Sequence, residues 1–526
     1  MTKVAFKTFI SSFLPEVTDG EVLTEHHIAY EISKEHLPDY SKRLVKEGAR
    51  FVTMVGVDER SLHGKFSLHY VFAFDDYGFF LTLKSYVTEE DPTFPSVTKE
   101  LPVCDWYERE VYDLLGLKPE GHPNLHRLIL HKDWPDHTYP LRKDYPLEKM
   151  QAFEQSKEWF STTYEGEGVT RVPVGPIHAG IIEPGHFQFG VAGDVILHLD
   201  AQLFFKHRGL EKRSEGMSLE KGLLLAERIC GMCSLSHAVS YAQAVEQLAQ
   251  VTIPKRAKYL RMIFLEMERL YNHIGDIGDI CSGAGFHFGT THGARLKEEL
   301  QQLNEKITGH RFLRGVISLG GVRRDIAEHE FLFLQTRLAE IRRDFRELVN
   351  IILEHEITLD RMATTGYLSK DVADELEVVG PAGRASGREI DVRKSHPYLK
   401  YDDVEFTTPT YTLCDVLARV HVRIDEVFDS FSIIRQLIDK MIKGPIQTEI
   451  KDIPPYQVGL GWSESSLGEN VHWLMTGPNN SIYRYRVRSA AYSNWPAVAQ
   501  AVPGNIVPDF PIINKSFELC YACCDR

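Results

Sequence analysis

The chain is poor in cysteine and contains no long hydrophobic run. Only eight of its 526 residues are cysteine, too few for the disulfide framework of a secreted protein of this length, which favours a reducing compartment. No apolar run reaches the roughly 20 residues that span a bilayer. The N-terminal segment turns acidic before a signal-like core develops. We therefore predict a cytoplasmic protein that reaches a membrane only through partner subunits.

Basic blocks and nucleotide-binding patterns are also absent. The 60 basic residues are outnumbered by 74 acidic ones, for a formal net charge of -14, so nucleic acid is not an expected partner. The glycine-rich piece at 275–285 lacks the strand-glycine-helix context of a dinucleotide fingerprint, and we expect no NAD or flavin site. The length predicts two or three domains with a large core.

Two Cys-x-x-Cys pairs are the most informative feature that is present, Cys230/Cys233 and Cys520/Cys523. Each pair places two sulfurs on one short turn, and thiolates select zinc, iron or nickel over hard ions. Structural zinc is the commonest use of four cysteines arranged in this way. Zinc pairs usually lie within a few tens of residues of each other, however, whereas these are far apart. The separation favours a large domain built around a metal centre, and structural zinc stays an open alternative.

The residues around the cysteines resemble those of the large subunit of nickel-iron hydrogenases. The first motif, ERICGMCSLSH, ends at His237, and the second, CYACCDR, ends at Arg526. In that family the precursor is cleaved just after the second motif, at a His or an Arg. The resemblance therefore implies that a chain ending at Arg526 is the mature form.

Other segments resemble respiratory complex I. Residues 104–147 resemble its small quinone-arm subunit, and the remainder resembles the adjoining larger subunit, which is related to hydrogenases but lacks the four cysteines. The matching segments of that remainder are GPIH at 175–178, EPGHF at 183–187, GGVRRD at 320–325, GRASG at 383–387 and HPYLKY at 396–401. The chain thus resembles the membrane-associated, complex I-like branch of the hydrogenases, of the formate hydrogenlyase large subunit type.

The resemblance implies a nickel-iron centre and the residues that serve it. All four cysteines would bind nickel, and Cys233 and Cys523 would also bridge to an iron that carries carbon monoxide and cyanide. Cys520 is the expected proton acceptor when dihydrogen is split. Glu183 stands near the place of the family's proton-gate glutamate, although the local spacing differs, and an exposed carboxylate is the alternative. Asp276 and Asp279 are a second candidate pair, for which solvated acids are the commoner interpretation.

An additional metal site is a further implication. Glu211 matches a glutamate that in many hydrogenases binds Mg or Fe together with a terminal histidine. Here Arg526 replaces that histidine, and a guanidinium offers only hydrogen-bond donors. Pairing of Glu211 with Arg208 or Arg526 is the alternative. His237 is expected either near the proximal iron-sulfur cluster of a partner or in structural packing.

Two departures from the family pattern bear on activity. Residues 464–468 read Glu-Ser-Ser-Leu-Gly where the family has Glu-Ala-Pro-Arg-Gly, so Leu467 replaces a fixed cation that polarises the site. Arg488 is a candidate substitute. Glu518 and Leu519 replace the Asp-Pro that normally precedes the second pair, and Cys524 is expected to be a packed spare thiol. A complex I-like coupling or electron-transfer subunit with a vestigial metal site is the rival hypothesis.

The predicted fold is α+β. A small docking domain at 1–147 precedes a connector at 148–171 and a catalytic domain at 172–526, which is a mainly helical bundle with a small sheet. Alternating apolar residues predict strands in FSLHYVFAF, GFFLTLKSYV and the hairpin 186–205. Apolar residues at three- and four-residue spacing predict helices over 219–249, 255–278, 326–355 and 413–442. The first cysteine pair would lie in the first of these and the second in a final irregular segment.

The expected activity is reversible conversion of dihydrogen to protons and electrons, with hydrogen evolution in a formate hydrogenlyase-type complex. Electrons would pass through an iron-sulfur small subunit with a proximal 4Fe-4S cluster, because too few cysteines remain here for a cluster chain. Ferredoxin-like subunits, membrane subunits and a formate dehydrogenase are the other implied partners, on the inner face of the cell membrane. The electron donor and the direction of turnover are left open.

Overall fold

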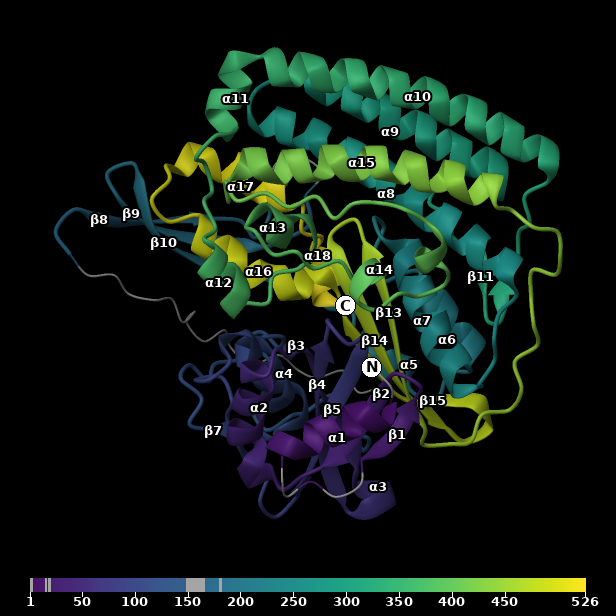
Figure 1. Cartoon of the computed structure of the whole chain (residues 1–526). Helices are drawn as coiled ribbons and strands as arrows, with labels where there is room; N and C mark the ends of the chain where they lie inside the picture. Colours follow the sequence, from purple (N-terminus) through teal and green to yellow (C-terminus); the bar gives the residue numbers. More distant parts are fainter. Residues whose placement is uncertain (1–2, 15–16, 18–19, 148–165, 179–181) are drawn as a thin grey trace.

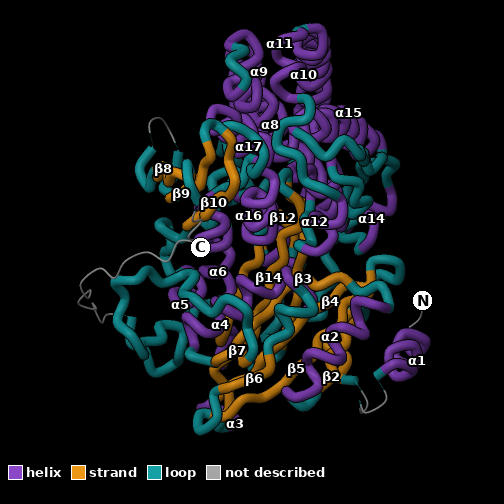
Figure 2. Tube along the Cα trace, turned by 90° about the vertical axis from the view of Figure 1, so that its left-hand side faces the viewer, coloured by secondary structure: helices purple, strands orange, loops and turns teal. Residues whose placement is uncertain are grey.

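A computed structural model describes residues 3–14, 17, 20–147, 166–178 and 182–526. Figure 1 shows the N-terminal strands and helices on one side of the molecule and a stack of long helices on the other. A three-stranded sheet from the C-terminal part of the chain lies between them, and the perpendicular view in Figure 2 shows the same layering. The mixture of helices and small sheets confirms the predicted α+β class.

The N-terminal region contains a five-stranded sheet of order β1-β2-β5-β4-β3, in which β2 and β5 are parallel and the other pairs antiparallel. The predicted strands FSLHYVFAF and GFFLTLKSYV are β4 and β5. Most residues of both strands are buried. The elements of this region are α1 (Lys3–Phe13), β1 (Glu21–Thr24), β2 (His27–Glu31), η1 (Lys34–His36), α2 (Leu37–Lys46), β3 (Arg50–Glu59), α3 (Arg60–His63), β4 (Lys65–Phe74), β5 (Phe79–Thr88), β6 (Thr93–Pro95), η2 (Pro102–Cys104), α4 (Asp105–Leu115) and β7 (Lys118–Glu120).

A second antiparallel sheet has the order β10-β9-β8 and is formed by β8 (Val169–Val174), β9 (His186–Ala192) and β10 (Val195–Gln202). The predicted hairpin is β9 and β10, joined at Gly193, whose positive φ suits a tight turn. Of the predicted connector, 148–165 lies outside the described residues, and 169–171 forms the first half of β8. The domain boundaries remain a prediction.

Four long helices form the bundle: α8 (Lys255–Gly283), α9 (His287–Thr308), α10 (Glu328–Glu354) and α15 (Val416–Asp439). The predicted helices 255–278, 326–355 and 413–442 correspond to α8, α10 and α15, whereas α9 was not predicted. A Cβ on Gly278 of α8 would meet the Cα of Gly293 of α9 at 3.2 Å. The two helix backbones therefore touch, and α8 is enclosed on nearly all sides.

The predicted helix 219–249 is interrupted. It consists of α6 (Leu219–Ala226) and α7 (Ser234–Leu248), and the first cysteine pair occupies the turn between them. Helix α7 packs on a meander of three antiparallel strands, β13 (Val458–Ser465), β14 (Gly468–Gly477) and β15 (Ser481–Arg488). A Cβ on Gly461 would lie 1.9 Å from the Ser240 carbonyl oxygen, so only glycine allows α7 this close to β13. This contact fixes the helix that follows Cys233.

The second cysteine pair is not on an irregular segment, as predicted, but on a short helix, α18 (Tyr521–Asp525). Cys520 is the N-cap of α18, and its sulfur accepts a hydrogen bond from the Cys523 N–H. The other elements are α5 (Leu210–Ser214), β11 (Ile317–Ser318), β12 (Gly321–Val322), α11 (Glu356–Met362), α12 (Lys370–Glu375), α13 (Gly380–Ala385), α14 (Val392–Ser395), η3 (Tyr401–Asp403), η4 (Pro478–Asn480), α16 (Ala490–Ala501), η5 (Val507–Asp509) and α17 (Phe510–Phe517). Among the described residues, the helices are all too short or too polar to span a membrane.

The N-terminal sheet docks on the meander through β3, which lies against β14 and β15. Arg50 of β3 binds Glu469 of β14, with 2.8 Å between Nη1 and Oε2, and Arg488 of β15 binds the same carboxylate. Arg488 also donates to the Val52 carbonyl oxygen at 2.9 Å. Buried ion pairs therefore join the N-terminal region to the sheet that supports the cysteines.

Candidate metal centre

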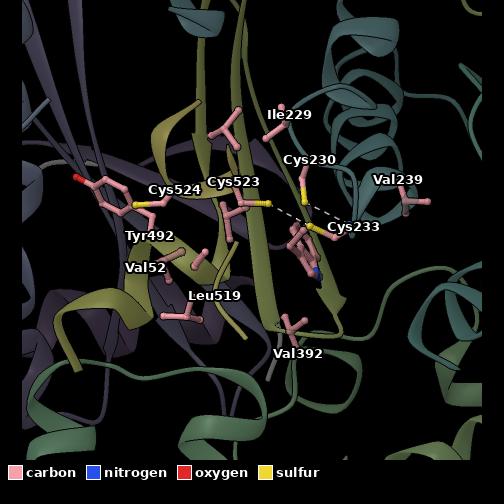
Figure 3. Close-up of a cluster of buried hydrophobic side chains, with 14 of the residues drawn as sticks. Val52, Ile229, Cys230, Cys233, Val239, Val392, Tyr492, Leu519, Cys523 and Cys524 are labelled. Carbon is pink, nitrogen blue, oxygen red and sulfur yellow. Dashed lines mark hydrogen bonds between the residues drawn. The ribbon is translucent and has the colours of Figure 1, made fainter. Parts of the chain in front are cut away.

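The four cysteines converge in the interior of the molecule. The Cys230 sulfur lies 3.3 Å from that of Cys520, and the Cys233 sulfur lies 3.2 Å from that of Cys523. Figure 3 shows the sulfurs of Cys230, Cys233 and Cys523 directed toward one another. Three of the four residues are buried and Cys520 is partly exposed. The two pairs thus form one compact group of soft donors with an open side at Cys520.

Backbone N–H groups hold the first sulfur of each pair. The Cys230 sulfur accepts from the N–H groups of Met232, at 3.1 Å, and Cys233, at 3.5 Å. The Cys520 sulfur accepts from the Cys523 N–H at 3.4 Å. Such donors stabilise a thiolate, the form of sulfur that binds metal. The same local geometry therefore prepares both halves of the site.

The four sulfurs differ in how readily they ionise. Burial opposes ionisation of Cys230, but hydrogen bonds from Cys233, Cys520 and Cys523 hold its pKa well below the ordinary value. The pKa of Cys233 and of Cys520 is raised, chiefly by their hydrogen bonds to Cys230, and burial raises the pKa of Cys523. Metal binding must therefore displace protons from the other sulfurs. The donor set fits nickel, iron or zinc and does not fit Mg²⁺ or Ca²⁺.

His237 lies directly beside the cluster. Its Nε2 is 3.4 Å from the Cys523 sulfur, and its Nδ1 is 2.9 Å from Nε2 of His472. The other ring nitrogen of His472, Nδ1, is 2.8 Å from the Tyr485 hydroxyl. The residue is fully buried, and burial lowers its pKa to about 4. The structure therefore supports the packing alternative for His237, as a neutral ring that also orients a cysteine sulfur.

Glu268 of α8 is a site residue that the sequence did not reveal. Its carboxylate accepts from the N–H groups of Leu235, at 2.7 Å, and Ser236, at 2.9 Å, and so caps the start of α7. Two neighbours on α8, Tyr271 and Asn272, donate to the Met232 carbonyl oxygen at 2.9 and 2.8 Å. Burial raises the pKa of Glu268 to about 7. One face of α8 therefore holds the turn that carries Cys230 and Cys233.

Glu183 lies at the outer edge of the cluster. Its Oε2 accepts from the Ala522 N–H at 2.8 Å, and Ala522 lies between Cys520 and Cys523 in the chain. The side chain is 38 % exposed and 3.9 Å from the Lys206 ammonium. The carboxylate thus contacts both solvent and the backbone of the second cysteine pair.

Asp276 and Asp279 differ from each other in environment. Asp276 is buried, with its Oδ2 3.4 Å from Nε of Arg423 and 3.7 Å from Nδ1 of His273. The interpretation as a solvated acid is therefore wrong for Asp276, because α8 is enclosed. Asp279, by contrast, is partly exposed. Burial, together with Asp276 and Asp279, raises the pKa of Glu518 well above its ordinary value. Glu518 precedes Cys520, the first residue of the second cysteine pair, by two positions in the sequence.

Glu211 is buried and paired with arginines. Its Oε1 lies 2.9 Å from Nη1 of Arg526, and its Oε2 lies 2.9 Å from Nη1 of Arg484. The other expected partner, Arg208, instead donates to the carbonyl oxygens of Arg228, at 2.9 Å, Ile229 and Ala522. The alternative in which Glu211 pairs with Arg526 is therefore the one found.

Leu467 lies beside the cluster, in the turn between β13 and β14. It is buried with Val379 and Ala490, and Cys520 packs against the three. Arg488 does not replace the missing cation, since its guanidinium binds Glu469 and the Val52 carbonyl. Cys524 is fully buried, and Figure 3 shows its sulfur directed away from Cys233. Cys524 thus lies apart from the four converging cysteines.

Comparisons with known proteins match three families along the chain. Residues 30–151 match the respiratory-chain NADH dehydrogenase 30 Kd subunit, residues 208–275 match nickel-dependent hydrogenases, and residues 284–460 match the respiratory-chain NADH dehydrogenase 49 Kd subunit. The hydrogenase match includes the first cysteine pair and Glu211.

Two relatives from Escherichia coli (strain K12) match over almost the whole chain. Formate hydrogenlyase subunit 5 is 34 % identical over 97 % of this chain and 91 % of its own length. Hydrogenase-4 component G is 35 % identical over 98 % of this chain and 91 % of its own length. A chain of the membrane-bound sulfane sulfur reductase, an archaeal respiratory membrane complex, has a TM-score of 0.65 at 27 % identity and covers 69 % of this chain and 100 % of its own length.

Proposed function

The chain belongs to the family of complex I-like, membrane-associated nickel-iron hydrogenase large subunits, and from that premise we propose that its four converging cysteines hold the metal centre at which dihydrogen is formed and split. This proposal rests on one observation: two remote parts of the chain bring together the sulfurs of Cys230, Cys233, Cys520 and Cys523. We propose hydrogen evolution in a formate hydrogenlyase-type complex as the physiological direction.

The sulfur donors fit a nickel-iron centre: all four cysteines would hold nickel, and Cys233 and Cys523 would also hold iron. When bound, the centre would supply heterolytic cleavage and formation of dihydrogen, and carbon monoxide and cyanide would be the remaining ligands of the iron. The protein shields most of the site from water, because Cys230, Cys233 and Cys523 are buried, α8 holds the 230–233 turn and α18 packs on α16. It also contributes backbone N–H donors that favour the thiolate form of Cys230 and Cys520.

Cleavage of dihydrogen requires a proton acceptor at the centre and a route to solvent, and hydrogen evolution uses the same groups in reverse to deliver protons. We propose that Cys520 is the acceptor, because it is the one cysteine of the four with partial exposure. Glu183 is the proposed next proton-carrying group on the route to solvent, since its carboxylate contacts both the Ala522 N–H and solvent. A carboxylate with one wet face can exchange protons with bulk water.

In hydrogen evolution, electrons must reach the centre through partner subunits. We propose an iron-sulfur small subunit with a proximal 4Fe-4S cluster, further ferredoxin-like and membrane subunits, and a formate dehydrogenase. The remaining cysteines, Cys104, Cys281, Cys414 and Cys524, are dispersed, which supports a cluster-bearing partner. The chain would lie peripherally on the inner face of the cell membrane, with residues 1–147 as a docking domain and 172–526 as the catalytic domain.

A coupling subunit with a vestigial metal site is a second candidate. It is favoured by Leu467, which puts an apolar side chain next to Cys520 where hydrogenases carry a cation. The matches to the 30 Kd and 49 Kd subunits are compatible with it.

Nickel analysis of the purified complex separates these candidates. About one nickel per chain, with infrared bands of iron-bound diatomic ligands and dihydrogen turnover, supports the first. Intact but empty cysteines would support the coupling subunit, and zinc at the four sulfurs would support a structural site.

A further inference from the structure

Arg526 lies between two buried carboxylates, where a divalent cation would otherwise be expected. Its Nη1 lies 2.9 Å from Oε1 of Glu211, and its Nη2 lies 2.8 Å from Oε2 of Glu110. The guanidinium also stacks on the Tyr492 ring, 4.6 Å from its centroid. The two acids and the arginine are 2–6 % exposed. Arg526 is therefore fixed by charge, hydrogen bonds and an aromatic face.

Two further arginines complete the neutralisation of these acids. Arg484 binds Glu211 at 2.9 Å, and Arg486 binds both Glu110 and Glu211. Three guanidinium groups thus face two carboxylates in a buried setting. Electrostatic repulsion opposes entry of another cation, and the carboxylate oxygens that would bind it are already engaged.

The same arginine connects three remote parts of the chain. Glu110 lies on α4 of the N-terminal region, Glu211 lies on α5, and Arg526 directly follows α18, the helix that contains Cys523. The Arg526 N–H donates to the Ala522 carbonyl oxygen at 3.1 Å, and its own carbonyl oxygen accepts from the Arg208 N–H at 2.7 Å. These contacts link α4 directly to the helix that carries Cys523.

We propose that Arg526 is an internal cation that takes the place of a metal ion between Glu211 and Glu110, and that it makes the position of Cys523 depend on docking of the N-terminal region. Arg526 and Glu110 are then positioning residues for the metal centre. This inference rests on the proposed function, because the consequence concerns retention of nickel at the four sulfurs.

The first experiment compares Glu110→Gln and Arg526→Lys with the wild-type complex. Because loss of such supporting contacts weakens metal binding about 10–100-fold, we expect nickel to be lost to a chelator about tenfold faster or more. In nickel-free protein, amide exchange of residues 519–526 should also accelerate. Lys143→Gln is the matched control: it removes the ion pair between the N-terminal region and Glu215, at 2.7 Å, without a contact to α18.

Wild-type nickel retention and exchange rates in Glu110→Gln would overturn the proposal while leaving the hydrogenase assignment intact. A wild-type complex without nickel would overturn the assignment instead, and the exchange rates of the nickel-free chain would still decide whether Glu110 positions α18. An equal effect of Lys143→Gln would also overturn the proposal, because any weakened docking would then suffice.

The second experiment titrates Mn²⁺ into the wild type and Arg526→His, followed by electron paramagnetic resonance. With a neutral imidazole in place of the guanidinium, Oε2 of Glu110 loses its arginine contact and Oε1 of Glu211 loses the shorter of its two, while Arg484 and Arg486 keep their own contacts. One of the three guanidinium groups is thereby removed, and one oxygen of each acid can turn to a divalent ion. We expect Arg526→His to gain one bound Mn²⁺ that the wild type lacks and that a second substitution, Glu211→Gln, removes. Equal Mn²⁺ binding in both proteins would show that Arg526 does not occupy a cation position.

Discussion

The sulfur of Cys233 lies 3.2 Å from that of Cys523, although the two residues are 290 positions apart in the chain. One belongs to the turn before α7 and the other to α18, so the contact joins the middle of the chain to its final segment. The supporting residues come from other elements, namely Glu268 from α8 and Glu183 from the segment before β9. A centre assembled in this way requires the whole fold to be in place before the ligands meet.

The ligand set predicts that the two adjacent cysteines of α18 differ in function. We expect Cys523→Ala to remove nickel from the chain, because it deletes one of four converging sulfurs. Cys524→Ala should retain nickel, because that sulfur is directed away from Cys233 (Figure 3). Nickel content of the two purified variants is the measurement. Equal loss from both would show that Cys524 is a ligand.

Glu183 should affect proton transfer without affecting the metals. We expect Glu183→Gln to keep its acceptor for the Ala522 N–H but to lower dihydrogen turnover about 100-fold, since an amide cannot carry the proton. Glu183→Asp, which keeps a carboxylate, should retain part of the activity. Turnover per nickel is measured for both variants. Full activity of Glu183→Gln would mean that protons leave by another route.

Leu467 should limit turnover because it removes a cation from the neighbourhood of Cys520. We expect Leu467→Arg to raise turnover per nickel by about tenfold or more, and to lower thermal stability because it buries an extra charge. Leu467→Met, which conserves volume and polarity, is the control. Turnover in Leu467→Arg at or below that of Leu467→Met would show that the missing cation does not limit the reaction.

Because Glu268 is buried and its pKa is raised, we expect the stability of the nickel-free protein to depend on pH. Burial raises its pKa from 4.5 to about 7. Below pH 4.5 the carboxyl is protonated in both the folded and the unfolded chain. Between pH 4.5 and 7 only the unfolded chain loses the proton. The free energy of unfolding contributed by Glu268 is therefore complete at low pH and decreases as the pH rises to about 7.

We expect the difference in unfolding free energy between wild type and Glu268→Gln to fall by about 3 kcal/mol between pH 4.5 and pH 7.5. Urea unfolding of both nickel-free proteins across this range provides the measurement. A difference that does not change with pH would mean that Glu268 ionises as readily in the folded chain as in the unfolded one.

Much of the fold was predictable because local patterns agreed with it. Strands β4 and β5 and helices α8, α10 and α15 follow from their apolar spacing. Helix α9 was missed although Leu296, Leu300, Leu303 and Ile307 form a buried apolar stripe in its second half. Its first half is polar and glycine-containing, and it contacts α8 there through the backbones of Gly278 and Gly293. A backbone contact of this kind leaves little periodic signal.

The site was predictable in its cysteines and not in its supporting residues. Cys-x-x-Cys spacing identifies chelating pairs, and the resemblance to hydrogenases predicted that the pairs meet. Glu268 and Asp276 lie on α8, where acids on a helix normally read as a solvated face. The alternating residues Arg484, Arg486 and Arg488 likewise indicate a solvent-exposed face of a strand. In the structure this face of β15 is buried against the N-terminal region. Burial of a charged face by another part of the chain is a tertiary property.

The most direct test of the account is X-ray absorption at the nickel edge of the purified complex, combined with nickel quantification. The account predicts about one nickel per chain surrounded by sulfur atoms, and loss of that signal in Cys230→Ala. Nickel bound only by oxygen or nitrogen, or zinc in place of nickel at the four cysteines, would contradict it.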